Sequence, residues 1–97
     1  MDNLTTDREE LRKILQKTFP KLWLKDSEEF SPEYKGGFWT GEGSHTDDEF
    51  ETPIFNYWDE TEVLYQMGVF NPLANLLEEH GWYAEAHDPG TYMIMPI

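Results

Sequence analysis

This chain has no cysteine, and most of its length has no lysine or arginine. Its 97 residues include no cysteine, which excludes a disulfide framework and thiolate chemistry. No lysine or arginine occurs from Gly36 to Ile97, although those 62 residues carry twelve carboxylates. Without positive charge this part of the chain has no P-loop lysine, and it is poorly suited to bind DNA, RNA or an anionic membrane directly.

Long apolar runs are also missing. The start of the chain, Met1 to Leu4, has no basic segment, and no apolar stretch approaches the length of a signal-peptide core or a membrane span. We therefore expect a soluble protein that acts in the cytoplasm, with which the lack of cysteine is compatible.

The charges divide the chain into two unequal parts. Residues 1–35 carry eight acidic and seven basic residues, while residues 36–97 carry twelve acidic and none basic, so nearly all of the net charge of −13 lies after Gly36. A halophilic protein would be acidic throughout. Because self-repulsion on this scale destabilises a compact state, the asymmetry favours a strongly positive partner.

Aromatic residues are abundant, with four Trp, five Tyr and six Phe. Disordered chains are poor in such residues, so we expect a folded protein, and the length suits one domain over residues 1–97. Five rings lie in expected strands and are predicted to be core residues: Trp39, Phe55, Tyr57, Trp82 and Tyr92. A ring that reaches the surface instead would be an interface anchor.

Capping patterns predict the helices. Thr6 and Glu9 form a capping box before a helix over Asp7–Thr18. Asp59 and Glu62 repeat the pattern, which predicts a second helix that ends near Met67, where Gly68 supplies a left-handed cap.

A third helix is predicted from Asn71, with Pro72 in its first turn, to His80. Strands are expected at four places: Phe38–Thr40, Ile54–Tyr57, Trp82–Ala86 and Thr91–Met95, the last two joined by a turn at His87–Gly90. Between Lys21 and Lys35 the pattern is mixed: Leu22–Leu24 fits a short strand, and Ser31-Pro32 fits the start of a single helical turn. The sum is an α+β fold, three helices packed on one face of a small, largely antiparallel sheet.

No pattern indicates an enzyme, a metal site or a cofactor. The three histidines, His45, His80 and His87, have no paired ligand spacing, and carboxylates are too abundant here for their proximity to mean much. The acidic tract Asp47–Glu51 lacks the alternating ligands and central glycine of an EF-hand loop.

The carboxylates differ in whether they help their own segment. Asp59, Glu60 and Glu62 would stabilise the first turn of the second predicted helix, whereas Glu78 and Glu79 oppose the dipole at the end of the third. The adjacent acids after His45 have no basic residue within ten positions in sequence. We therefore predict a partner-binding, phosphate-mimicking set: Glu42, Asp47, Asp48, Glu49, Glu51, Glu78 and Glu79.

In a chain of this size, the stretch Leu4–Leu15 and the acidic tract Asp47–Glu51 resemble phage-encoded anti-CRISPR proteins of type I-F, of the DNA-mimic kind. The resemblance implies an inhibitor in the cytoplasm of the host bacterial cell. It would bind the basic DNA channel of a crRNA-guided surveillance complex and block target recognition. The alternative from the charge pattern is an acidic adaptor or antitoxin-like protein that masks a basic protein surface, and an enzyme using one of the histidines is third.

Overall fold

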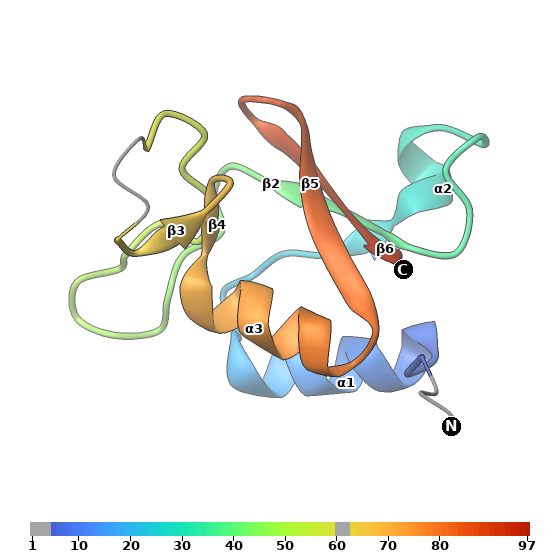
Figure 1. Ribbon diagram of the computed structural model, residues 1–97, viewed down its shortest axis with the longest axis horizontal. Coiled ribbons are helices and arrows are strands. Elements are labelled where there is room, and N and C mark those ends of the chain that lie inside the picture. Colours follow the sequence, from blue (N-terminus) through green and yellow to red (C-terminus); the bar gives the residue numbers. More distant parts are fainter. Residues whose placement is uncertain (1–4, 60–62) are drawn as a thin grey trace.

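The computed structural model describes residues 5–59 and 63–97 (Figure 1). Its helices are α1 (Arg8–Thr18), α2 (Ser27–Phe30) and α3 (Asn71–Glu79). Its strands are β1 (Lys25–Asp26), β2 (Phe38–Gly41), β3 (Tyr65–Gln66), β4 (Val69–Phe70), β5 (Trp82–Asp88) and β6 (Thr91–Pro96). The predicted α+β class is confirmed.

Four strands form one antiparallel sheet in the order β1-β2-β6-β5, and β3 and β4 form a separate hairpin. The predicted hairpin at the end of the chain is confirmed and is longer than predicted, since β5 runs to Asp88 and β6 to Pro96. The strand predicted at Phe38 is also confirmed as β2, which pairs with the far side of β6. A carboxy-terminal strand thus lies at the centre of the sheet.

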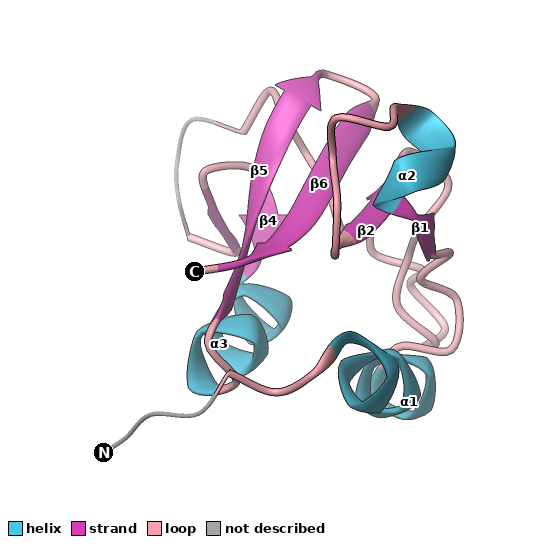
Figure 2. Ribbon diagram, turned by 90° about the vertical axis from the view of Figure 1, so that its right-hand side faces the viewer, coloured by secondary structure: helices cyan, strands magenta, loops and turns pink. Residues whose placement is uncertain are grey.

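One face of this sheet forms the hydrophobic core. The register aligns Phe38, Ile94 and Ala84 across β2, β6 and β5, so their side chains share a face. That face packs against α1 and α3, which contribute buried leucines at helical spacing: Leu11 and Leu15 from α1, Leu73 and Leu77 from α3. Figure 2 shows both helices on the same side, below the sheet.

Helix α2 does not pack on this face of the sheet. Phe30 of α2 contacts Trp39, with ring centroids 5.3 Å apart, and Trp39 alternates with Phe38 along β2. Adjacent residues of a strand point to opposite faces, so α2 covers the face away from the core, near the β1–β2 end of the sheet. The prediction that all helices share one face is therefore wrong.

The first helix begins one residue later than its predicted capping box. Asp7 is the cap, and its Oδ1 accepts a hydrogen bond of 2.9 Å from Glu10 N. Thr6 instead places its Oγ1 2.8 Å from Nδ1 of His80, beside the start of β5. A tertiary contact thus takes the side chain that the local pattern assigned to capping.

The short strand predicted at Leu22–Leu24 is wrong, whereas a single hydrogen-bonded turn does begin at Ser31, where Tyr34 N donates to Ser31 O at 3.0 Å. The strand is β1, just after Leu22–Leu24, and the short helix α2 precedes Ser31-Pro32. Asp26 N donates to the side chain of Glu29, which fixes the entry to α2.

The helix predicted from Asp59 to Met67 is wrong in the part that is described, because Tyr65–Gln66 is strand β3; Glu60 and Glu62 lie outside the described residues. Met67 and Gly68 both have positive φ, 53° and 81°, as a two-residue hairpin turn requires. A strand at Ile54–Tyr57 is also wrong, since only Phe55 makes an isolated bridge, to Val69.

The helix predicted at Asn71 is confirmed as α3, with two local differences. Phe70 occupies the cap position, and the Asn71 side chain donates to Val63 O at 2.9 Å instead of capping the helix. The helix ends at Glu79, and His80 N closes it by donating to Leu77 O.

Glu28 joins α2 to both α1 and the loop before β2. Its Oε1 accepts from Arg8 Nη1 at 2.7 Å, and its Oε2 accepts from Gly36 N at 2.9 Å. The Gly36 amide first, and Arg8 second, lower the pKa of this carboxyl from 4.5 to about 2. The ionised form therefore stabilises the fold above the unfolded pKa, and that contribution is lost as pH falls from 4.5 toward about 2.

We expect Glu28→Gln to lower the midpoint of thermal unfolding at neutral pH, and the difference from the unmodified chain to shrink between about pH 4.5 and about pH 2. Thermal unfolding followed by circular dichroism over this pH series measures it. The control is Glu33→Gln, an exposed carboxylate of the following loop. An equal pH response from the two variants would contradict the assigned role of Glu28.

Candidate acidic and apolar interface

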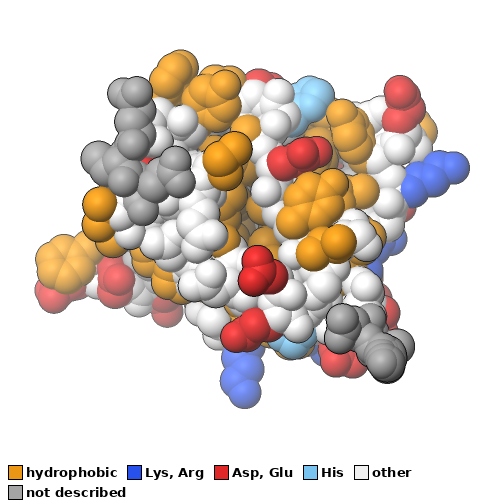
Figure 3. Space-filling view, in the orientation of Figure 1, with side chains coloured by type: hydrophobic (Ala, Val, Ile, Leu, Met, Phe, Trp, Pro, Cys, Tyr) orange, Lys and Arg blue, Asp and Glu red, His pale blue; other side chains and the backbone are white. Residues whose placement is uncertain are grey.

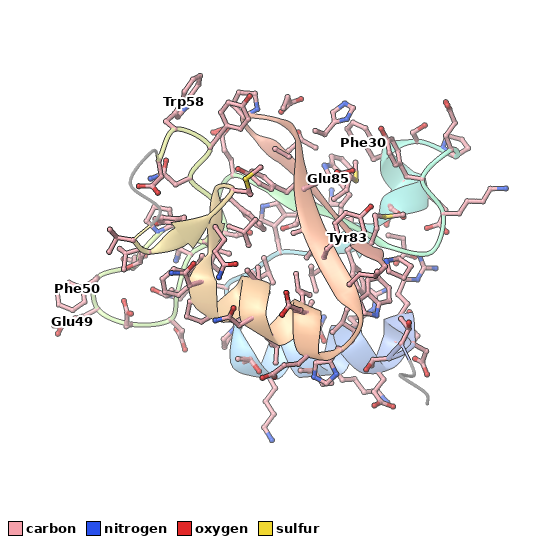
Figure 4. All side chains as sticks on the ribbon, viewed as in Figure 1. Phe30, Glu49, Phe50, Trp58, Tyr83 and Glu85 are labelled. Carbon is pink, nitrogen blue, oxygen red and sulfur yellow. The ribbon has the colours of Figure 1, made fainter. Side chains whose placement is uncertain are left out.

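The loop after β2 holds most of the predicted acidic site. Its two arms are held together at the base, where Thr46 N donates to Thr52 O at 2.8 Å and Ile54 N donates to Ser44 O at 3.0 Å. Residues 47–51 are all exposed at its tip. Figure 4 shows Glu49 and Phe50 there, at the far left of the molecule.

Asp48 has a structural role that the sequence did not reveal. Its Oδ1 accepts hydrogen bonds from Phe50 N at 2.9 Å and from Glu51 N at 3.0 Å, which turns the chain back on itself. Glu51 then adopts a φ of 47°, in the left-handed region. The tip is therefore a defined turn that projects Phe50, 79% exposed, between acidic side chains.

Two of these acids lie near a cationic or imidazole side chain, one from before β2 and one from within the loop itself. Lys21 Nζ lies 3.7 Å from an oxygen of Asp47, and His45 Nε2 lies 3.7 Å from an oxygen of Glu51. Sequence separation concealed the first contact, because Lys21 follows α1 and is brought to the loop by the fold. At this distance and exposure the pairs are weak and leave the tip acidic.

Glu42 lies at a different place, next to the β5–β6 turn. Its N donates to Gly90 O at 3.1 Å, and its carbonyl accepts from Trp23 Nε1 at 2.7 Å. A methyl group at Gly90 would lie 2.5 Å from the Glu42 carboxylate, so this side chain extends over the turn.

Glu78 and Glu79 are exposed at the carboxyl end of α3. In Figure 1 this end, the tip of the loop after β2 and the β5–β6 turn are three separate parts of the molecule. The structure thus brings together Asp47, Asp48, Glu49 and Glu51, and it places Glu42 and the Glu78–Glu79 pair apart from them. The seven predicted residues do not form one cluster.

Exposed hydrophobic side chains accompany the acids. Among residues 5–59 and 63–97, the large exposed ones all come after Gly36: Phe50, Tyr57, Trp58, Val63, Leu64, Met67, Tyr83 and Ile97. Tyr57 was predicted to be a core residue, and it is 46% exposed, with its ring 5.1 Å from that of Trp58. Between Phe50 and Met67 no local pattern distinguishes the exposed residues from core residues, because the described part of this segment forms only the two-residue strand β3.

Lys21 reaches Asp47 of the acidic turn, but other basic side chains are held by partners on the other part of the molecule. Arg8 pairs with Glu28 and Arg12 with Glu9 and Asp26, while Lys25 lies over the Trp39 ring at 5.1 Å. In Figure 3 red and orange side chains share the visible face, and blue ones occur only at its lower and right edges. The surface built from residues 36–97 therefore combines negative charge with exposed apolar groups.

The three histidines lie apart in the fold. His80 contacts Thr6, His45 lies beside Glu51, and the ring of His87 packs 4.9 Å from that of Phe30. Within the described residues no group of three or more His, Asp or Glu side chains is arranged to hold a metal ion. Nor does any helix in that part of the chain have the length and apolarity needed to cross a membrane.

Comparison with protein-family models, with curated proteins and with solved structures gives no match.

Proposed function

We propose that this protein is an inhibitor that occupies a basic, nucleic-acid-binding surface of another protein in place of the nucleic acid. The observation that supports the proposal is the segregation of charge. Residues 36–97 carry twelve acids and no base, while the arginines of α1 are engaged in ion pairs on the other part of the molecule. A surface of this kind is attracted and steered by the same positive potential that recruits DNA.

The acidic turn at residues 47–51 is the part best suited to imitate a phosphate backbone. Its carboxylates are exposed, and the hydrogen bonds of Asp48 hold the turn in one conformation, which lowers the entropy lost on binding. The resemblance noted above makes the type I-F CRISPR surveillance complex the candidate partner, with its DNA channel as the surface occupied.

Competition with target DNA tests the proposal. A reconstituted type I-F surveillance complex is titrated with this protein at several concentrations of target duplex, and duplex binding is followed by electrophoretic mobility. We expect inhibition that excess duplex reverses and that raised salt weakens. Inhibition that excess duplex does not reverse, or no binding to the complex, would overturn the proposal.

A second candidate is an acidic adaptor or antitoxin-like protein that masks a basic surface unrelated to DNA. The exposed aromatic pair Tyr57 and Trp58 favours it, because such rings anchor protein interfaces and a phosphate mimic does not require them. The same assay separates the two candidates, since a masking protein is not displaced by duplex.

A further inference from the structure

Within the described residues, the sheet ends on one side in a long edge strand that is paired on only one of its sides. In the order β1-β2-β6-β5, one edge is β1, which has two residues, and the other is β5, which has seven. Within residues 5–59 and 63–97, β6 is the strand that pairs with β5. Very short edge strands resist further pairing, so β5 is the edge open to another strand.

The register shows which backbone groups of β5 point outward. Ile97 N donates to Gly81 O at 2.9 Å, so this pair belongs to the hydrogen-bonded set. Such pairs alternate in an antiparallel ladder, which directs the N–H and C=O of Tyr83 and Glu85 toward β6. The N–H and C=O groups of Ala84 and Ala86 therefore point away from the sheet.

Apart from the charge of Glu85, this edge lacks the usual protection against strand addition. Residues 82–86 include no proline and no lysine, and the irregularity in the ladder comes only after Ala86. The side chains at Ala84 and Ala86 are small, so they do not screen the outward backbone groups.

A groove follows the same edge. Two cavities of about 190 and about 530 Å³ adjoin β5, and both are lined by Ala84 and by Met67 of the β3–β4 turn. Met67 is 81% exposed and forms the opposite wall together with Gly68. Figure 3 shows the hollow left of centre.

The groove is negatively charged, which favours a positively charged occupant. Glu78 lines the smaller cavity and Glu85 the larger one, and no lysine or arginine exists in residues 36–97 to balance them. A second copy of this chain would bring another net charge of −13 to the same edge. A segment with positive charge is favoured electrostatically over self-pairing.

We propose that β5 accepts an extended segment of a protein partner, in which lysine or arginine alternates with apolar residues, as an added strand along Ala84 to Ala86. Main-chain hydrogen bonds to the outward groups of β5 supply affinity. The basic side chains lie on the same face of the sheet as Glu85, and the apolar ones lie on the opposite face, where they contact Met67. This proposal rests on the proposed function, since it gives the basic partner a second, strand-like contact besides the acidic turn.

The test uses the full chain and a short probe, acetyl-Lys-Val-Lys-Val-Lys-amide. Amide hydrogen exchange followed by NMR should show exchange at Ala84 and Ala86 slowed at least ~10-fold by saturating probe, because their N–H groups gain acceptors. Tyr83 and Glu85, already bonded to β6, should be unchanged. The matched probe with glutamate in place of lysine should not bind.

Ala84→Pro tests the backbone contact directly. It removes an outward N–H but no hydrogen bond to β6, a position where edge strands tolerate proline. We expect probe affinity to fall at least ~10-fold, equivalent to about 1.4 kcal/mol. If circular dichroism shows that the variant does not fold, a probe N-methylated at alternate residues makes the same test on the unmodified chain, with the same expected loss.

Three outcomes would overturn the proposal. The first is that neither Ala84→Pro nor N-methylation of the probe changes the affinity for the probe, and the second is that the probe does not slow amide exchange at Ala84. The third is that exchange at Ala84 slows without probe as protein concentration rises, which would make a second copy of the chain the occupant. Failure of the proposed function gives a different result from failure of the strand contact. In that case the chain would bind the probe at β5 and yet not compete with duplex for the surveillance complex. Conversely, competition without probe protection rejects only the strand contact.

Discussion

Gly68→Ala is expected to lower the free energy of unfolding by about 3 kcal/mol, since it combines backbone strain with overpacking. Gly68 has a φ of 81°, in the left-handed region that disfavours side chains. A Cβ there would overlap Tyr92 Oη and would lie 3.2 Å from Asn56 O. Tyr92 is fully buried in the centre of the sheet and stacks on Phe55 at 4.3 Å, so it cannot move aside easily.

The Tyr92 hydroxyl provides a way to separate the backbone strain from the overpacking. Within the part of the chain that the structure describes, no group hydrogen-bonds Tyr92 Oη, so Tyr92→Phe removes an unsatisfied buried oxygen. We expect this change alone to be neutral or to stabilise by about 1 kcal/mol. In the Tyr92→Phe background the cost of Gly68→Ala should fall to the backbone penalty of about 1–2 kcal/mol.

Urea unfolding of the four chains in this cycle measures the coupling. Additive effects of the two substitutions would contradict the contact between the Gly68 position and Tyr92 Oη. A pH series checks separately that the Tyr92 hydroxyl is buried. Burial, and then Tyr57, raises the pKa of Tyr92. The stability that comes from its neutral form is present below the unfolded pKa of 10.0 and is lost as pH rises above it, and Tyr92→Phe should reduce that loss.

Gly68 also shows why part of the fold could not be predicted from the sequence. A glycine with positive φ serves equally as the cap after a helix and as the second residue of a hairpin turn. The Asp59 capping pattern favoured the helix, but pairing of Tyr65 with Phe70 decides for the hairpin. That choice depends on Val69 packing in the core, which local sequence does not encode.

Segments with strong local signals were predictable. Proline in the first turn of α3, helical spacing in α1 and the turn between β5 and β6 each specify an element without help from distant residues. The segment between α1 and β2 is different, because α2 is held by Arg8 and by Gly36 through the single side chain of Glu28. Contacts between distant parts of the chain position that helix.

The residues of the candidate site also differ in how far the sequence predicts their positions. Exposure of the tract at residues 47–51 follows from charge alone, since buried unpaired carboxylates are prohibitively costly. The separation of Glu42 and of Glu78 from that tract depends on where β2 and α3 end in space. The exposed rings of Phe50 and Trp58 were also unpredictable, because apolar residues give no sign in sequence of which ones the fold leaves outside.

Neutralising the acidic turn is the second large effect that we expect. The variant Asp47→Asn, Asp48→Asn, Glu49→Gln removes three charges, and the asparagine at position 48 keeps an oxygen that can accept from Phe50 N and Glu51 N. If each lost charge contributes up to about 1 kcal/mol, binding to the surveillance complex should weaken ~10- to ~100-fold.

The control variant is Glu10→Gln, Glu29→Gln, Glu33→Gln, which removes the same number of exposed charges from the part of the chain that holds the bases. Both variants have the same net charge, so a nonspecific effect of charge would weaken them equally. A phosphate-like contact at the turn predicts instead that the turn variant alone loses affinity. Its logarithm of affinity should also fall less steeply with the logarithm of salt concentration, because fewer charge contacts are screened. Equal losses, or an unchanged salt slope, would show that the turn is a solvated loop and that the acidic surface acts only through its total charge.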